Sequence, residues 1–197
     1  MTTWVETPRG GRDRGPRGIA RAWAEVLIRP RRFFETGVAP GDQAPGLVFA
    51  VVTAVGYALL LALLDPLRFP ASGAIRAAVI VLLVAVLVAP AALHLLAAIQ
   101  TLCLMVTVRD RAGVSETVQV LAYATAPCPL AAVPVPELRL VCCLYGAALL
   151  VVGLSTVHET TTGRAILAAA LPAVLLFGYG FGGFDALLVL LRNWYII

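Results

Sequence analysis

Five long apolar stretches constrain what this chain can fold into. The first, residues 46–64, contains no charged side chain, and its length matches the roughly 20 residues that an α-helix needs to cross about 30 Å of hydrocarbon. The others cover residues 74–108, 117–133, 138–157 and 164–183. The sequence therefore predicts an all-α, polytopic membrane helix bundle of five transmembrane spans.

Composition supports this class. Hydrophobic residues make up 60% of the 197 residues and charged residues 13%, against roughly 45–50% and about 25% in soluble domains. So little charge cannot cover the surface of a water-soluble globule. This excludes a cytosolic enzyme, a nucleic-acid reader and a disulfide-stapled secreted module.

Prolines interrupt the second and third stretches. At about 1.5 Å per residue, residues 74–108 are too long for one untilted crossing and too short for two with a turn. They predict one long helix that is kinked near Pro90 and extends toward Arg109. The third stretch contains Pro127 and Pro129, so it is either a full crossing or a re-entrant segment; its length favours the crossing.

Arginines orient the bundle. Eight of the 15 lie before residue 33, ahead of the first apolar stretch, which is typical of attachment to an anionic membrane surface rather than to nucleic acid. With five crossings and the N-terminus inside, eleven arginines lie on the inner side and four on the outer side, as the positive-inside rule requires. We expect a multi-pass protein of the cell membrane with a cytoplasmic N-terminus.

Four regions follow from these patterns. Residues 1–17 are rich in Gly, Arg and Pro and predict a flexible cytoplasmic tail. Residues 18–36 predict an amphipathic helix, and residues 46–191 the five-span membrane domain. Residues 192–197 contain Trp and Tyr beside an arginine, which is typical of an anchor at the membrane interface.

The amphipathic segment has apolar residues at helical spacing, with arginines among them. This pattern predicts a helix that lies in the membrane interface, followed by an aromatic wedge. The alternative is a helix packed on a protein domain. The predicted membrane-surface residues are Arg21, Trp23, Arg29, Arg31 and Arg32.

Polar residues and glycines inside the spans are the candidate functional positions. An ionisable residue within a span is a functional candidate, and His94 lies one turn after Pro90. It either bonds to another span and holds the bundle together, or handles a substrate or a proton. Gly178 and Gly182 predict a close helix contact of the small-xxx-small type. The full set is His94, Gln100, Tyr123, Pro127, His158, Gly178 and Gly182.

No catalytic group, cofactor or metal site is predicted. His158 and Glu159 begin an H-E-x-x-H pattern, but Thr162 stands in place of the second histidine. The cysteines show no C-x-x-C spacing and lie in apolar stretches, where a thiol acts as a small hydrophobe. They are Cys103, Cys128, Cys142 and Cys143.

Several loose motifs resemble the Yip1 family of five-span membrane proteins. Tyr123 is followed four residues later by Pro127, and the fourth apolar stretch ends in Gly-Leu-x-x-Val-His at residues 153–158. Gly163 and Arg164 follow, then Pro172 in the fifth stretch, and the approach from Trp23 to Pro30 is also similar to prokaryotic members. The resemblance extends from about Trp23 to about Gly183.

The resemblance implies five spans, a cytoplasmic N-terminus and association within the membrane. Eukaryotic members bind prenylated Rab GTPases and carry an Asp-Leu-Tyr-Gly-Pro motif. Residues 1–45 lack that motif, so Rab binding is not carried over to this chain. What the resemblance leaves is a small member of prokaryotic type.

Three hypotheses about function follow. The first is a non-enzymatic scaffold or helper that binds the lipid bilayer and a partner membrane protein or a second copy of itself, with no nucleic acid. The second is a small transporter or channel-like permease that uses His94, Gln100 and the proline-broken third stretch. The third and weakest is a metal-dependent membrane enzyme that uses His94 and His158.

Overall fold

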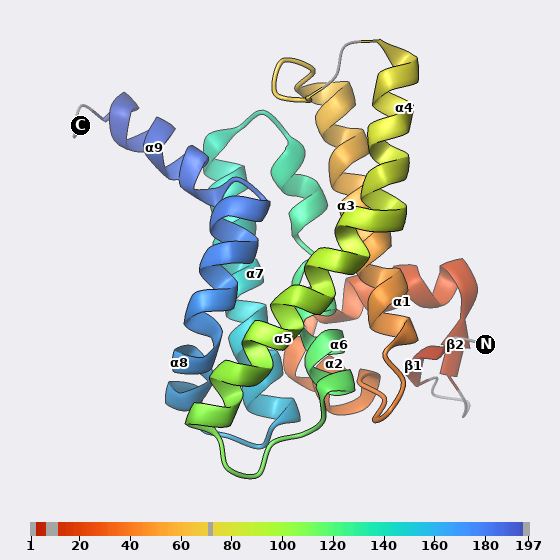
Figure 1. Cartoon of the computed structure of the whole chain (residues 1–197), viewed down its shortest axis with the longest axis vertical. Helices are drawn as coiled ribbons and strands as arrows, with labels where there is room; N and C mark the ends of the chain where they lie inside the picture. Colours follow the sequence, from red (N-terminus) through yellow and green to blue (C-terminus); the bar gives the residue numbers. More distant parts are fainter. Residues whose placement is uncertain (1–2, 7–11, 71–72, 195–197) are drawn as a thin grey trace.

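The computed structural model describes residues 3–6, 12–70 and 73–194 (Figure 1). Two short antiparallel strands, β1 (Thr3–Glu6) and β2 (Arg12–Arg14), precede a helical chain. The α-helices are α1 (Gly15–Ile28), α2 (Pro30–Gly37), α3 (Ala44–Leu64), α4 (Ala74–Leu83), α5 (Ala89–Thr107), α6 (Val114–Ala124), α7 (Pro136–Val157), α8 (Thr162–Ala173) and α9 (Gly183–Asn193). Three tighter or wider helical segments connect some of them: the π-helices η1 (Val84–Val88) and η3 (Val174–Gly180), and the 3₁₀-helix η2 (Cys128–Ala132).

Four helices in the described part of the chain are long and apolar enough to cross a membrane. They are Ala44–Leu64, Ala74–Thr107, Pro136–Val157 and Thr162–Gly180. Their positions agree with the first, second, fourth and fifth apolar stretches. The chain is therefore an all-helical membrane bundle apart from the two short strands.

The third apolar stretch is broken, as its prolines predicted, and it is not among the four helices that could cross a membrane. Helix α6 ends at Ala124, and a turn and η2 follow. Pro127 and Pro129 explain the break, since a proline offers no N–H and its ring clashes with the preceding turn. Figure 1 nevertheless shows this segment passing from the loop before α6 at one end of the bundle to the loop before α7 at the other.

Protein surrounds this broken passage. Every residue from Thr117 to Cys128 is buried. Irregular backbone at membrane depth is tolerated where protein encloses it, because neighbouring groups can satisfy its N–H and C=O groups. The segment can therefore contain a break in its helix because the surrounding protein buries it.

Residues 74–107 form one long helix that bends just before Pro90. The π-helix η1 occupies Val84–Val88 at the bend, and the Ala89 N–H donates to the Val84 carbonyl five residues back. Figure 1 shows α4 and α5 inclined to each other on either side of η1. The predicted kink near Pro90 is confirmed, and the local widening of the helix accommodates the missing donor.

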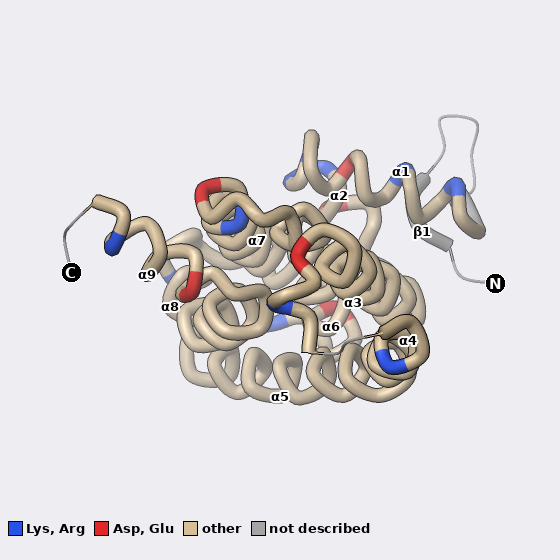
Figure 2. Tube along the Cα trace, turned by 90° about the horizontal axis from the view of Figure 1, so that it is seen from above, with Lys and Arg blue, Asp and Glu red and all other residues tan. Residues whose placement is uncertain are grey.

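The N-terminal helices pack on the bundle. Phe33 and Phe34, which the sequence suggested as an aromatic wedge in lipid, are 0% and 2% exposed. The Phe33 ring lies edge-on to Tyr123 of α6, with ring centroids 4.7 Å apart. In Figure 2, α1 and α2 lie on the side of the bundle opposite α5. The protein-packed alternative describes this apolar face better than a helix resting on lipid alone.

The helix boundaries also differ from the predicted segment 18–36. Helix α1 begins at Gly15, and Pro30 starts α2 as a separate helix. Of the predicted tail, residues 1–2 and 7–11 lie outside the described residues. At the other end, α9 leaves the bundle (Figure 1) and Trp194 is 68% exposed, whereas Tyr195 lies outside the described residues.

Candidate functional site

A proline in α8 explains the most deeply buried polar contact between two long helices. Pro172 lies inside α8 and has no N–H to offer the Ala168 carbonyl, four residues earlier. The Nε2 of Gln100, on α5, donates to that carbonyl at 2.9 Å, and Gln100 is 0% exposed. The amide thus satisfies a group that the proline leaves open and joins α5 to α8.

A related pattern occurs at three other breaks, where the proline stands at the position whose N–H would donate in a 3₁₀ turn rather than in an α-helix. The carbonyls of Leu27, Ala126 and Ala131 are each followed, three positions later, by a proline: Pro30, Pro129 and Pro134. A side chain from another element donates in each case: Tyr145 Oη to Leu27, Trp23 Nε1 to Ala126 at 2.7 Å, and Arg139 Nε to Ala131 at 2.7 Å. Since hydrocarbon offers no donor to an open carbonyl, these bonds hold the broken segments in the bundle.

Side chains also hold the enclosed third segment from the side of α3. The buried Gln119 amide donates to the Ala39 carbonyl at 2.7 Å, and its oxygen accepts from the Ala39 N–H at 3.0 Å. Farther along, the hydroxyls of Thr53 and Thr125 lie 2.8 Å apart. The third segment is therefore bonded to its neighbours along its length.

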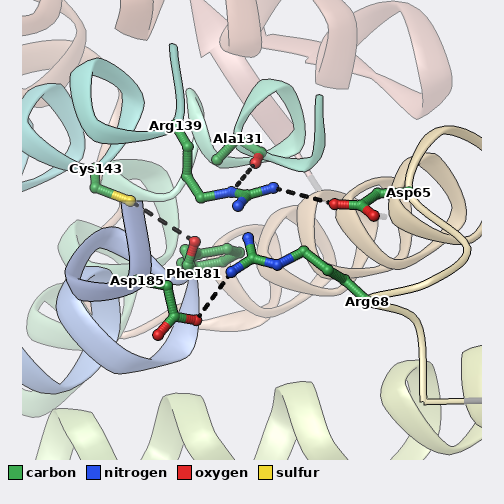
Figure 3. A network of polar contacts seen from close by, with 7 residues as sticks. All are labelled: Asp65, Arg68, Ala131, Arg139, Cys143, Phe181 and Asp185. Carbon is green, nitrogen blue, oxygen red and sulfur yellow. Dashed lines mark hydrogen bonds and ion pairs between the residues drawn. The ribbon is translucent and has the colours of Figure 1, made fainter. Parts of the chain in front are cut away.

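Four charged residues gather at the end of the bundle where α3 ends and α7 and α9 begin (Figure 3). Arg139 is 4% exposed, and its Nη2 lies 3.9 Å from the Asp65 Oδ2. That Nη2 has no hydrogen-bond partner among the described residues. Nearby, the Arg68 Nη2 lies 3.4 Å from the Asp185 Oδ2 in a pair that is largely exposed. The exposed pair is worth little, whereas removing one partner of the buried pair would be costly.

At the opposite end of the bundle, His158 joins the end of α7 to the loop before α6. It caps the end of α7 and is 1% exposed. Its Nδ1 accepts from the Ala112 N–H at 3.1 Å, and its Nε2 faces the Thr117 hydroxyl at 3.5 Å. Burial, aided by the positive charge of Arg111, lowers the pKa of His158 to about 4. A neutral ring is what the bond from Ala112 requires, because a protonated Nδ1 cannot accept.

An apolar cavity of about 290 Å³ lies between α3, the long helix and η3, close to the charged end. Its lining includes Ala54 and Tyr57 of α3, Ala92 of α5, and Phe181 after η3. The ring of Tyr57 lies edge-on to that of Phe181, with centroids 5.1 Å apart. Neither His94 nor Tyr123 belongs to the lining.

Comparison with known proteins identifies the family. The model of the Yip1 domain matches residues 24–184, which include all four candidate spans and the broken third segment. The chain belongs to the Yip1 family. No curated protein and no solved structure matches it. The matched region of this Yip1 domain also contains Arg139, Gln100 and His158, with the bonds described above.

Within the Yip1 domain, His94 is exposed and Gln100 is buried, although both lie on α5. His94 is exposed on the outside of α5, and its Nδ1 lies 2.7 Å from the Pro90 carbonyl of its own helix. In the part of the chain that the structure describes, it makes no bond to another span, which differs from the first of its two interpretations. Gln100, lower on the same helix, makes the interhelical bond instead.

Tyr123 and Pro127 have structural positions in the Yip1 domain. Tyr123 is 0% exposed and packs against the rings of Phe33 and Phe49. Pro127 immediately precedes η2 at the break of the third segment. Both residues thus shape the packing of the enclosed passage.

The two predicted contact glycines act within the chain. A Cβ on Gly178 would overlap the ring of Phe184, and Gly182 has a φ of 73° at the turn into α9. The first allows a close approach and the second a left-handed turn that favours glycine. Because η3 ends at Gly180, the two glycines do not form one strip on a continuous helix.

The predicted membrane-surface residues divide into two groups. Arg29, Arg31 and Arg32 are exposed. Arg21 bonds to Glu25 at 3.1 Å on the same helix, and Trp23 turns its indole into the bundle.

Among the described residues, no three His, Cys, Asp or Glu side chains are grouped to hold a metal ion, and the four cysteines are free.

Sequence reasoning missed Tyr145, Arg139, Asp65 and Asp185. The sequence did contain a signal for two of them, because each proline break leaves a carbonyl that needs a donor. It did not show which distant side chain supplies the donor, since Tyr145 and Leu27 are 118 residues apart.

Proposed function

We propose that this member of the Yip1 family is a non-enzymatic scaffold or helper of the cell membrane, which acts through lateral contacts with a partner membrane protein or a second copy. The observation that carries the proposal is the outer surface of the helix Ala74–Thr107. Only 11% of its most apolar window is buried. Val86 and Val106 on this helix are 71% and 88% exposed.

The use of the buried polar groups supports the same proposal. Gln100, Gln119, His158 and Trp23 each bond to the backbone of another element. These side chains fasten the bundle, and none of them lines the large apolar cavity. A transport role is the second candidate, but His94 no longer supports it, because His94 lies on the outside of α5.

The topology we propose has five passages and a cytoplasmic N-terminus. Four passages are the long helices, and the fifth is the enclosed segment of α6 and η2. The arginine distribution supports this orientation, with the loops before α6 and α8 facing the cytoplasm.

Site-specific photo-crosslinking in cells tests the scaffold proposal. A photoreactive amino acid at Val86 or Val106 is expected to give discrete adducts with one partner membrane protein or with a second copy. The matched control is Leu104 on the same helix, which is 0% exposed and should react only within the chain. Lipid adducts alone from both outer positions, together with a strictly monomeric protein in nanodiscs, would overturn the proposal.

A further inference from the structure

We infer that the apolar cavity between α3, the long helix and η3 holds one acyl chain of an anionic phospholipid, whose phosphate lies at Arg68 and Arg76. The inference concerns a ligand site and does not depend on the scaffold role. It rests on the lining of the cavity, the helices that shape it and the cations at its rim.

The cavity has the size and lining of a site for a hydrocarbon chain. Its volume is about 290 Å³, and an apolar cavity of about 150 Å³ already stays dry and accepts benzene. Ala50, Ala54 and Ala58 are among the residues that α3 contributes to its wall. Val88, which also lines it, is 52% exposed, so the cavity opens at the lateral surface, where lipid chains are the solvent.

Both π-helical segments of the described chain border this cavity. Val84 and Val88 come from η1, and Leu176 and Gly180 come from η3. Single π turns within α-helices are frequent at functional sites. Here both contribute side chains or backbone to the lining of one cavity.

The rim at the charged end carries cations. Phe69 and Pro70 line both the cavity and an adjoining hollow that includes Arg76. Arg76 is exposed and has no ion-pair partner among the described residues. Arg68 precedes Phe69, and its partly exposed contact with Asp185 is 3.4 Å long. A phosphate can therefore bind Arg76 and compete for Arg68 without breaking the buried pair of Arg139 and Asp65.

Native mass spectrometry of the full chain in a mild detergent tests the inference. Phosphatidylglycerol and phosphatidylcholine with the same acyl chains are added in separate arms, and glycerol phosphate in a third. We expect one phosphatidylglycerol to be retained several-fold better than phosphatidylcholine, and no retention of glycerol phosphate. The variant R68A/R76A should retain both lipids equally.

Two matched variants on α5 separate the cavity from the rest of the surface. Ala92 and Ala98 are both exposed, but only Ala92 lines the cavity. Ala92→Phe should reduce lipid retention several-fold, whereas Ala98→Phe should retain lipid as the parent chain does. Thermal unfolding of both variants checks that each is folded.

Four results would overturn the inference. Equal lipid retention by Ala92→Phe and Ala98→Phe would place the lipid elsewhere on the surface. Equal retention of phosphatidylglycerol and phosphatidylcholine by the parent chain would show that the site does not recognise an anionic headgroup. Binding of glycerol phosphate alone would show a site for a free phosphate. A dimer lost only in Ala92→Phe would show that a second copy fills the cavity.

Discussion

Gln100, Trp23 and Arg139 each donate a hydrogen bond to a carbonyl that lies three or four residues before a proline. In water such a carbonyl would bind solvent, but hydrocarbon offers no replacement. At these three breaks the carbonyl therefore takes its donor from another element. At the level of single residues, the effect of changing one of these polar side chains therefore depends on the proline near its acceptor.

His158 gives a pH-dependent test at this scale. Burial lowers its pKa from 6.5 to about 4 in the folded chain, so below pH 6.5 the unfolded chain takes up the proton first. The free energy of unfolding should therefore fall as the pH decreases from 6.5 to about 4, and this effect should be absent above 6.5. Thermal unfolding in detergent across this window measures it.

The control for His158 is an uncharged side chain that can still accept a bond. His158→Asn keeps an acceptor near the Ala112 N–H and cannot titrate. Between pH 5 and 6.5 the variant should lose part of the slope that the parent chain shows. Identical slopes in the two proteins would mean that His158 is not held neutral by the fold.

At the scale of elements, four long helices could be predicted from the sequence because each consists of an apolar run of sufficient length. The third segment could not be settled in this way. Its prolines predicted a break, but whether the segment crosses depends on the neighbours that enclose Thr117–Cys128. The same limit applied to α1 and α2, since an apolar helix face looks alike whether lipid or protein covers it.

The candidate functional residues, like the helices, could be predicted only in part. The sequence indicated polar residues within spans as candidates, and one of them, Gln100, bonds to a neighbouring helix. It could not show which face of α5 points inward, and so it favoured His94, which lies outside. Helix rotation is set by packing, and the almost uniformly apolar α5 gives little periodicity from which to infer it.

A double-mutant cycle tests the pairing of a proline with its donor. Gln100→Leu should destabilise the parent chain by roughly 1 kcal/mol, the scale of one interhelical hydrogen bond in a membrane bundle. Pro172→Ala supplies an N–H to the Ala168 carbonyl from within α8. In that background the same Gln100→Leu change should cost measurably less, as determined by unfolding in detergent.

His94→Leu is the matched control for this cycle. His94 lies on the same helix, but it is exposed and its Nδ1 contacts the Pro90 carbonyl of its own helix. It should leave stability nearly unchanged in both backgrounds. If Gln100→Leu lowers stability by the same amount with and without Pro172, then Gln100 does not compensate for the donor that Pro172 lacks.

At the scale of the whole molecule, the bundle has two distinct ends. One end has the loops before α6 and α8, joined by His158 and Ala112. The other has the charged cluster where α3 ends and α7 and α9 begin. The enclosed third segment links these ends (Figure 1), and whether it crosses the membrane distinguishes the proposed five-pass protein from one with a re-entrant segment.

Cysteine labelling on either side of this segment tests the account most directly. Asp110 and Glu137 are both exposed and flank it. Each is changed to cysteine in a chain whose four native cysteines are replaced, and intact cells are treated with a membrane-impermeant maleimide. We predict that Glu137→Cys reacts in intact cells and that Asp110→Cys reacts only after permeabilisation. Labelling of both positions from the same side would contradict the five-pass bundle.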